Sequence, residues 1–211
     1  MYAAAQAKPP SIEGEHLGPA ATSEPHLVGT YKPGREIYAQ GDLNDKCYQV
    51  STGAVRVYRL LSDGCRQVVS FHLPGEMFGF EAGSNQFFFA DAITETTLAV
   101  FGRRHMQERS RELLALALTG MARAQQHLLV IGRQSAVERI AAFLVDLCES
   151  QGGGRQLRLP MSRQDIADYL GLTIETVSRA MTKLKARSVI ALRDARTIDI
   201  VRLEALGSLC R

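Results

Sequence analysis

The pattern of apolar and polar positions divides the chain into a strand-forming part and a helix-forming part. From Val28 to about Phe101, short runs rich in β-branched and aromatic residues alternate with polar turns, and the clearest are CYQVS, AVRVYRL, QVVSFHL and TLAVF. The turns contain four evenly spaced glycines, Gly41, Gly53, Gly64 and Gly75. Because glycine tolerates the positive φ of tight turns, this spacing predicts antiparallel hairpins folded into a β-roll or jelly roll. A repeat protein is the alternative, but the strand residues themselves do not repeat.

A seam of apolar residues predicts one long helix from residue 106 to residue 134. Apolar side chains recur there at alternating steps of three and four residues, at Leu114, Ala117, Met121, Ala124, Leu128 and Ile131. Two helices pair with this spacing in a coiled coil, so we expect these residues to form the interface of a homodimer. The alternative is that the seam packs against the chain's own domain.

The pattern of the C-terminal part predicts a winged helix-turn-helix. Ser162 opens a short helix that stops at Gly171, and Thr173 caps a second helix. The buried face of the second helix is expected to contain Val177, Met181 and Leu184. Two strands, Val189 to Leu192 and Thr197 to Val201, then form the wing.

Three polar side chains lie on the outer face of the second of these helices. Glu175, Ser178 and Arg179 stand at i, i+3 and i+4. The second helix of a helix-turn-helix enters the DNA major groove, where arginine donates to guanine, a carboxylate accepts from cytosine and serine contacts a base or a phosphate. We therefore expect these three residues to read bases. The alternative is that Glu175 and Arg179 form only an exposed ion pair within the helix.

Positive charge gathers around these helices, although the net charge of the chain is only +3. Between residues 176 and 196 six basic side chains stand against one acid, Asp194. Contacts from lysine and arginine to phosphates supply much of the affinity for DNA. Together with the wing, this charge favours DNA binding over the ion pair alone. The residues expected at the DNA backbone are Ser162, Thr173, Thr176, Lys183, Lys185, Arg187 and Arg196.

Composition and motifs exclude several other classes of protein. The N-terminus lacks an apolar signal region, and the longest apolar run near the middle, Leu113 to Leu118, is too short to span a membrane. We therefore expect a cytoplasmic protein without membrane contact. The four cysteines have no metal-binding spacing, and no nucleophile motif or phosphate loop is present. We expect reduced structural thiols, no metal, no cofactor and no enzymatic activity.

These patterns divide the chain into four parts and predict an α+β fold. Residues 1–27 are rich in Ala, Pro, Gly, Ser and Glu without a hydrophobic period, and we expect them to form a flexible tail. The β-roll is expected over residues 28–105 and the dimerisation helix over residues 106–134. Ser135 has the position of a helix N-cap and begins the winged helix-turn-helix domain, which is expected over residues 135–211.

Three segments of the chain resemble the CRP/FNR family of bacterial transcription regulators, over residues 28 to about 205. They are the β-roll ending in LPGEMFGFEAG, the long central helix, and SRQDIADYLGLTIETVSRAMTKLKARSVI with its wing. Glu175, Ser178 and Arg179 are similar to the recognition motif of the FNR and FixK branches. The resemblance implies a homodimer on a palindromic, TTGAT-N4-ATCAA-like site in double-stranded DNA, and activation by recruiting RNA polymerase.

The sequence departs from the family pattern in the expected sensor domain. Nucleotide-binding members carry Arg followed by Ser or Thr after a Gly-Glu pair, whereas Gln86 and Phe87 fall there in this sequence. A cyclic phosphate would lose its charge partner, so we do not expect cyclic AMP binding. The first 46 residues contain no cysteine, which argues against the iron–sulfur cluster of oxygen-sensing relatives. Haem binding through His72 or His105 stays open, although a lone histidine is more often structural.

In these departures the sequence resembles the FixK branch. The resemblance implies that activity is controlled through synthesis, with micro-oxic respiration and nitrogen-fixation genes among the targets. The alternative is a regulator that responds to redox state or to a small molecule through the β-roll. Phe87, Phe88 and Phe89 would then line a pocket, although core packing is the simpler interpretation. Among the thiols, Cys210 is expected to be the most accessible.

Overall fold

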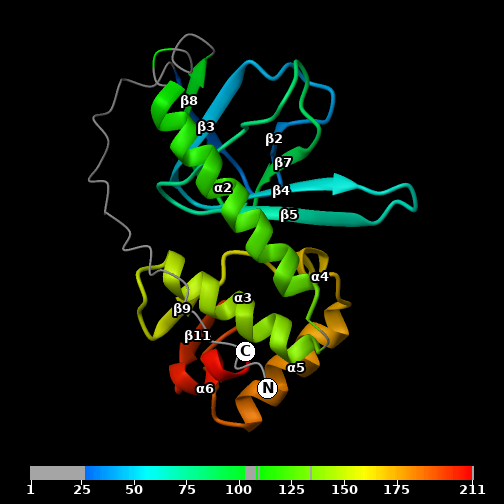
Figure 1. Cartoon of the computed structure of the whole chain (residues 1–211), viewed down its shortest axis with the longest axis vertical. Coiled ribbons are helices and arrows are strands. Elements are labelled where there is room, and N and C mark those ends of the chain that lie inside the picture. Colours follow the sequence, from blue (N-terminus) through cyan, green and yellow to red (C-terminus); the bar gives the residue numbers. More distant parts are fainter. Residues whose placement is uncertain (1–26, 103–107, 109, 134, 211) are drawn as a thin grey trace, which may run out of the picture.

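The computed structural model describes residues 27–102, 108, 110–133 and 135–210. They form a β-roll and a helical C-terminal domain, with one long helix running alongside both (Figure 1). This is the α+β arrangement that the sequence predicts. The flexible tail expected at residues 1–27 lies outside the described residues, except for Leu27, which begins the first strand.

The β-roll consists of two four-stranded antiparallel sheets, with strand orders β1-β8-β3-β6 and β2-β7-β4-β5. The strands are β1 Leu27–Tyr31, β2 Glu36–Tyr38, β3 Lys46–Thr52, β4 Val55–Leu60, β5 Arg66–His72, β6 Met77–Phe78, β7 Phe89–Ala92 and β8 Thr96–Gly102. The four apolar runs of the sequence correspond to β3, β4, β5 and β8. Tyr48, Val57, Phe78 and Leu98 are among the side chains of the roll's core.

Glycine is required at the turn between β3 and β4. Gly53 has a φ of 90°, and a Cβ built on it would lie 2.4 Å from both the backbone oxygen of Glu95 and Oγ1 of Thr96. The Thr96 hydroxyl also bonds to the backbone of Ala54, at 3.1 Å from its N and from its O. These hydrogen bonds therefore hold the turn against the start of β8. Gly41, Gly64 and Gly75 also have positive φ, as predicted.

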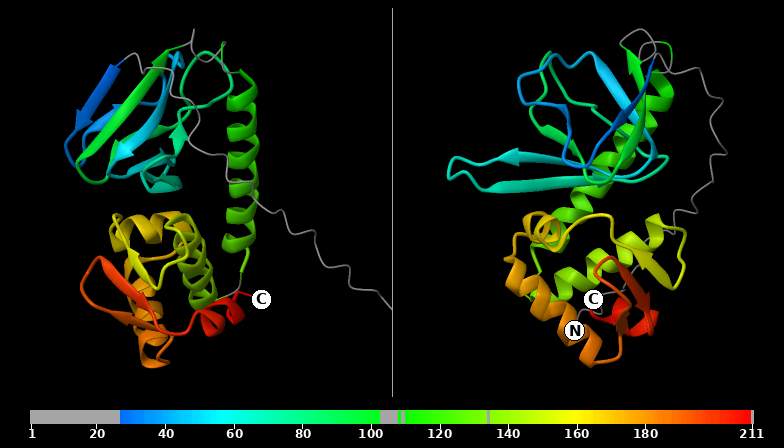
Figure 2. Two further views of the ribbon diagram at one scale, coloured as in Figure 1. Left: turned by 90° about the vertical axis from the view of Figure 1, so that its left-hand side faces the viewer. Right: turned by 180° about the vertical axis from the view of Figure 1, so that it is seen from behind.

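The long helix α2, Ser110–Ile131, lies along one side of both domains (Figure 2). It corresponds to the helix expected over residues 106–134, of which 106, 107, 109 and 134 lie outside the described residues. Arg123 donates to Oε1 of Glu76 at 2.6 Å, and the ring of His127 stacks on Tyr169 with centroids 3.8 Å apart. These contacts hold one face of α2 against the chain's own domains.

The predicted seam lies on a different face of α2. Leu114, Met121 and Leu128 are 61%, 54% and 68% exposed, and Ala117 and Ala124 are exposed as well, whereas Ile131 is half-buried. The alternative, in which the seam packs against the chain's own domain, is therefore wrong for the five exposed positions.

The C-terminal domain packs four helices around a small sheet of order β10-β11-β9. Its elements are α3 Ala136–Ser150, β9 Gln156–Arg158, α4 Arg163–Leu170, α5 Ile174–Ala186, β10 Ile190–Leu192, β11 Thr197–Ile200 and α6 Leu203–Ser208. The expected wing is β10 and β11. Helix α6 was not predicted from the sequence, and its Leu206 is fully buried in the core of this domain.

Candidate nucleic-acid interface

Local hydrogen bonds set the start and the end of α4. The Ser162 hydroxyl accepts from the backbone N of Asp165 at 3.1 Å, and Asp165 accepts from the backbone N of Ser162 at 2.9 Å, which completes a capping box. Gly171 ends the helix in the left-handed conformation, with φ 62° and ψ 44°. Since few other residues adopt that conformation without strain, the turn before α5 is encoded locally.

Helix α5, the predicted recognition helix, has Thr173 as its N-cap, and the Thr173 hydroxyl accepts from the backbone N of Thr176 at 3.2 Å. Its apolar face is buried in the domain and consists of Val177, Ala180, Met181 and Leu184. The opposite face points outward. Glu175 and Arg179 are exposed and Ser178 is half-buried, so the helical spacing brings the three predicted base-reading residues to one outer surface.

Glu175 and Arg179 do not form a helix ion pair. Within the described chain, no nitrogen–oxygen distance of 4.0 Å or less joins the two side chains. Hydrogen bonding by its own backbone N–H, then by Thr173, and the charge of Arg179 lower the pKa of Glu175. The side chain is therefore an ionised acceptor at neutral pH, and Arg179 keeps its donors available to a ligand.

A shallow groove of about 380 Å³ lies along this outer face. Its lining residues are Ser178, Arg179, Thr182, Lys183 and Ala186. Alternating hydroxyl and cationic side chains at successive turns suit an anionic ligand that carries many hydrogen-bonding groups. The groove is open rather than enclosed, as a surface that receives a polymer must be.

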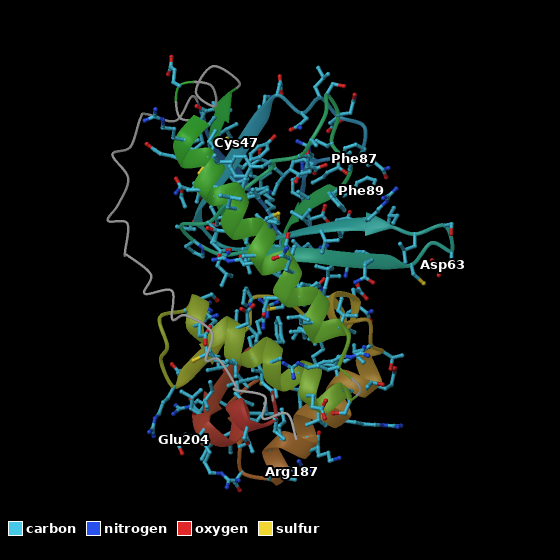
Figure 3. All side chains as sticks on the ribbon, viewed as in Figure 1. Cys47, Asp63, Phe87, Phe89, Arg187 and Glu204 are labelled. Carbon is cyan, nitrogen blue, oxygen red and sulfur yellow. The ribbon has the colours of Figure 1, made fainter. Side chains whose placement is uncertain are left out.

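Further cationic side chains are exposed on α5, at its C-terminal end and on the wing. Lys183, Lys185, Arg187 and Arg196 are exposed, and Figure 3 shows Arg187 at the end of the molecule farthest from the β-roll. Arg193 pairs with Asp199 of β11 and is thus held on the wing.

Two of the residues expected at the DNA backbone have a structural task as well. The Ser162 hydroxyl donates to Oδ2 of Asp165 at 2.7 Å, so its proton is engaged in the capping box. Thr173 caps α5 and its hydroxyl lies 3.0 Å from that of Thr176. A phosphate that binds the Ser162 or the Thr173 hydroxyl would therefore have to compete with these hydrogen bonds.

Two β-roll side chains at the positions compared with nucleotide-binding members have partners within the chain. Glu76 of the Gly-Glu pair accepts from Arg123 of α2, and Gln86 is buried, with its Nε2 donating to Oδ1 of Asn44 at 3.2 Å. Burial, and then the charge of Arg123, lowers the pKa of His72 to about 4. His105, the other histidine considered for haem, lies outside the described residues.

The three phenylalanines do not line a common pocket. Phe88 packs against the core of the roll, Phe89 stacks on Tyr58 with centroids 5.4 Å apart, and Phe87 is 51% exposed. Core packing is thus correct for Phe88 and wrong for Phe87, because the loop turns its side chain outward (Figure 3).

The expectation that Cys210 is the most accessible thiol is wrong. Cys65 is exposed, at the hairpin between β4 and β5, whereas Cys210 is half-buried and Cys47 and Cys148 are buried. Hydrogen bonding to Asp63, and then its charge, raises the pKa of Cys65, which lowers its thiolate fraction. Cys210 is covered because α6, absent from the prediction, places its Sγ 3.4 Å from the backbone oxygen of Leu206.

None of the described helices has both the length and the apolar character needed to cross a bilayer. Among the described side chains, no three His, Cys, Asp or Glu gather as a metal ion would require.

Comparison with known proteins agrees with this geometry. A cyclic nucleotide-binding domain matches residues 28–111, and a Crp-like helix-turn-helix domain matches residues 138–209. The nitrogen fixation regulation protein FixK of Rhizobium meliloti is 89% identical over the full length of both chains. FixK of Bradyrhizobium diazoefficiens is 39% identical, with 93% of this chain and 85% of that protein covered.

A solved structure agrees as well. FixK2 from Bradyrhizobium japonicum superposes with a TM-score of 0.83 at 38% identity, covering 88% of this chain and 97% of that one. The relatives are named as regulators, which confirms the expectation of a DNA-binding regulator rather than an enzyme. The chain belongs to the CRP/FNR family of transcription regulators, in its FixK branch.

Proposed function

We propose that the chain is an activator that binds a palindromic, TTGAT-N4-ATCAA-like site as a homodimer. The observation that carries this proposal is the outer face of α5, where Glu175 is exposed and where Ser178 and Arg179 line an open groove. Among the described residues, no acidic side chain lies within 4.0 Å of the Arg179 guanidinium. Arg179 would donate to a guanine, Glu175 would accept from a cytosine amine, and Ser178 would contact a neighbouring base or phosphate.

The DNA backbone would be held by the cationic surface around α5. Lys183, Lys185, Arg187 and Arg196 are exposed and within the described chain have no ion-pair partner at 4.0 Å or less. Ser162 and Thr173 are the N-caps of α4 and α5, and Thr176 lies in the first turn of α5, so all three would contact phosphates from the N-terminal ends of these helices. Each phosphate contact releases counterions, so affinity should fall steeply with salt.

The homodimer would form through the seam on α2. Five of its six apolar residues are exposed in the single chain, and Leu118 and Leu129 widen the same apolar surface. Exposed apolar residues repeated at heptad spacing suit an identical helix from a second copy. The two-fold axis of such a pair would match a palindromic site.

We propose further that neither cyclic AMP nor an iron–sulfur cluster controls the chain. Glu76 is already paired with Arg123, and no guanidinium stands at Gln86 or Phe87 to receive a cyclic phosphate. The curated relatives are named for nitrogen fixation, so the genes controlled would belong to that process or to micro-oxic respiration. The β-roll surface would contact RNA polymerase in the cytoplasm, where the promoter lies.

The test is binding of purified, ligand-free protein to a TTGAT-N4-ATCAA duplex and to a scrambled duplex at one salt concentration. Specific regulators bind their site at least about 10³-fold tighter than other DNA, so a preference below about tenfold would contradict the proposal. Parallel titrations with peroxide and with cyclic AMP should leave the affinity unchanged. A change with either would favour the sensor alternative.

A further inference from the structure

A cluster of five charged side chains joins the β-roll to the helix-turn-helix. It consists of Arg56 on β4, Arg66 on β5, Asp91 on β7, and Asp165 and Asp168 on α4, and it is called here the junction cluster. Arg56 donates to Asp91 and to Asp165, at 2.9 Å each. Arg66 donates to Asp165 at 2.7 Å and to Asp168 at 2.8 Å. In Figure 1 the β4–β5 hairpin lies directly beside α4.

The members of the junction cluster are largely removed from solvent. The Asp165 side chain is 3% exposed, and the other four are between 11% and 23% exposed. Two cations face three carboxylates, and neutral donors offset the difference, since Ser162 donates twice to Asp165 and Gln164 donates to Asp168. Removing one member of such a buried ion pair is costly because the charge of the other member is left uncompensated.

The Asp165 carboxylate accepts hydrogen bonds both from its own domain and from the β-roll. Its Oδ2 accepts from the backbone N and the hydroxyl of Ser162, which begins α4. Its Oδ1 accepts from Arg56 and Arg66, which belong to the β-roll. The carboxylate that starts the first helix of the reading unit therefore also fixes the place of that helix on the roll.

Other contacts at the junction act in the same direction. Gln67 of β5 donates to the backbone oxygen of Asp168 at 2.6 Å. The ring of Tyr169 lies 5.1 Å from that of Phe71 and 3.8 Å from that of His127 on α2. Since α4 also packs on α5, a shift of α4 on the β-roll would carry the recognition helix with it.

We propose that Arg56 and Arg66 are positioning residues for DNA reading: from the β-roll they hold α4, and through it α5, at the separation that a palindromic site requires, without an effector. This inference rests on the proposed function. In a symmetric pair the two recognition helices must meet half-sites about one helical turn apart, so their separation depends on how each reading unit sits on its β-roll.

The positioning role predicts different effects on two affinities, that for the palindrome and that for a single half-site. A merely structural role would change both affinities together. Neither arginine lies on α5 or the wing, so contacts within one half-site stay intact when they are replaced. What is lost is the simultaneous engagement of both half-sites, which depends on fixed geometry. A loss of folded protein would instead weaken binding to every duplex by the same factor.

The test uses the full-length Arg56→Gln, Arg66→Gln double variant and three duplexes: the palindrome, one with a single intact half-site, and a scrambled one. We expect palindrome affinity to fall about tenfold or more while half-site affinity changes less than about twofold. Arg59→Gln is the matched control, because Arg59 is exposed on the same hairpin and outside the junction cluster. It should behave like the wild-type chain on all three duplexes.

Equal losses on the palindrome and the half-site, or no loss on either, would overturn the positioning role. If the double variant does not fold, Arg66→Gln alone decides, since Arg56 still neutralises Asp165, and the same split between duplexes is expected at smaller size. Circular dichroism and sedimentation establish that each variant is folded and paired. A wild-type chain without preference for the palindrome would overturn the proposed function itself, which the variants do not test.

Discussion

Arg179 and Lys185 are both exposed on α5, but they face different parts of the proposed DNA site. Arg179 lines the groove beside Ser178, whereas Lys185 lies in the last turn. We expect Arg179→Ala to cost about 1–3 kcal/mol on the specific site and to relax the preference at one guanine per half-site. Lys185→Ala should weaken all sequences alike and reduce the salt slope by about one.

Fluorescence anisotropy on the specific duplex, on single-base variants of it and on a scrambled duplex separates these outcomes. A uniform loss from both substitutions would show that Arg179 binds phosphate and does not read a base. The comparison is matched, because both residues are cationic, exposed and on one helix.

His72 makes stability depend on pH in a defined window. Burial, then the charge of Arg123, lowers its pKa from 6.5 to about 4, and Glu76, with its Oε2 4.0 Å from Nδ1, also faces the ring. The folded chain keeps His72 neutral, while the unfolded chain takes up a proton below pH 6.5. The free energy of unfolding should therefore decrease as pH falls from about 6.5 to 4, by about 1.4 kcal/mol per unit at most.

Urea unfolding of the wild-type chain and of His72→Gln across that window measures this effect. The variant cannot titrate there, so its slope against pH should be shallower by the contribution of about one proton. His127, whose pKa burial also lowers, remains in both chains and cancels in the difference. Identical slopes would contradict a neutral, buried His72.

The sequence predicted the residues whose position follows from helical spacing, and missed those that meet across the fold. Glu175 and Arg179 lie on the outer face because Val177 and Met181 must be inside. Arg56 and Asp165 are 109 residues apart, and no local pattern states that they pair. The one signal was the alternation in β4, where Arg56 lies between the inward Val55 and Val57 and must point away from the roll's core.

At the scale of elements, two turn glycines that look alike in sequence should respond differently to substitution. Gly41 has a φ of 97°, and a Cβ built on it would meet nothing within 4 Å, whereas a Cβ on Gly53 would meet Glu95 and Thr96. Gly41→Ala should lose about 1–3 kcal/mol through the backbone conformation alone. Gly53→Ala adds a clash with fixed backbone and should lose about 4 kcal/mol or more.

Thermal unfolding of the two variants in one buffer tests the difference between the turns. Gly53→Ala should unfold at the lower temperature. Equal decreases in unfolding temperature would mean that the backbone at the start of β8 moves to accommodate the added Cβ. DNA affinity of the folded fraction should be unchanged for Gly41→Ala, since a Cβ at Gly41 would meet no atom of α4 or α5 within 4 Å.

Elements with local signals were predicted well. Ser162 and Gly171 delimit α4 through a cap and a left-handed turn, which adjacent residues encode. By contrast, α6 was missed because its six residues have no side-chain cap at Arg202 and too few turns to show a period. It is stabilised by burying Leu206 against the domain core, and that tertiary contact is not visible in the sequence.

At the scale of the whole molecule, an apolar stripe on α2 is exposed in the described part of a single chain. The face of α2 that meets the chain's own domains uses Arg123, His127 and Val130, whereas Met121 points elsewhere. The heptad spacing therefore indicated which face is free. The heptad spacing could not predict how the β-roll packs on α4, because that packing depends on side chains from three strands.

Met121→Glu should convert the proposed homodimer into monomers. Two glutamates would face each other across a seam that buries apolar side chains, and burying unpaired charge is costly. Gln126→Glu is the matched control, because residue 126 is exposed on the same helix and outside the seam. Sedimentation equilibrium should show the monomer mass for the first variant and the dimer mass for the second.

The DNA binding of Met121→Glu can be compared with that of the junction-cluster double variant. A Met121→Glu monomer should lose the palindrome's advantage and keep half-site affinity, as the Arg56, Arg66 double variant does, although that variant stays paired. The two variants thus reach one binding defect by different routes, and sedimentation tells them apart. A Met121→Glu chain that remains dimeric, or that is monomeric yet prefers the palindrome, would contradict the α2 seam as the interface.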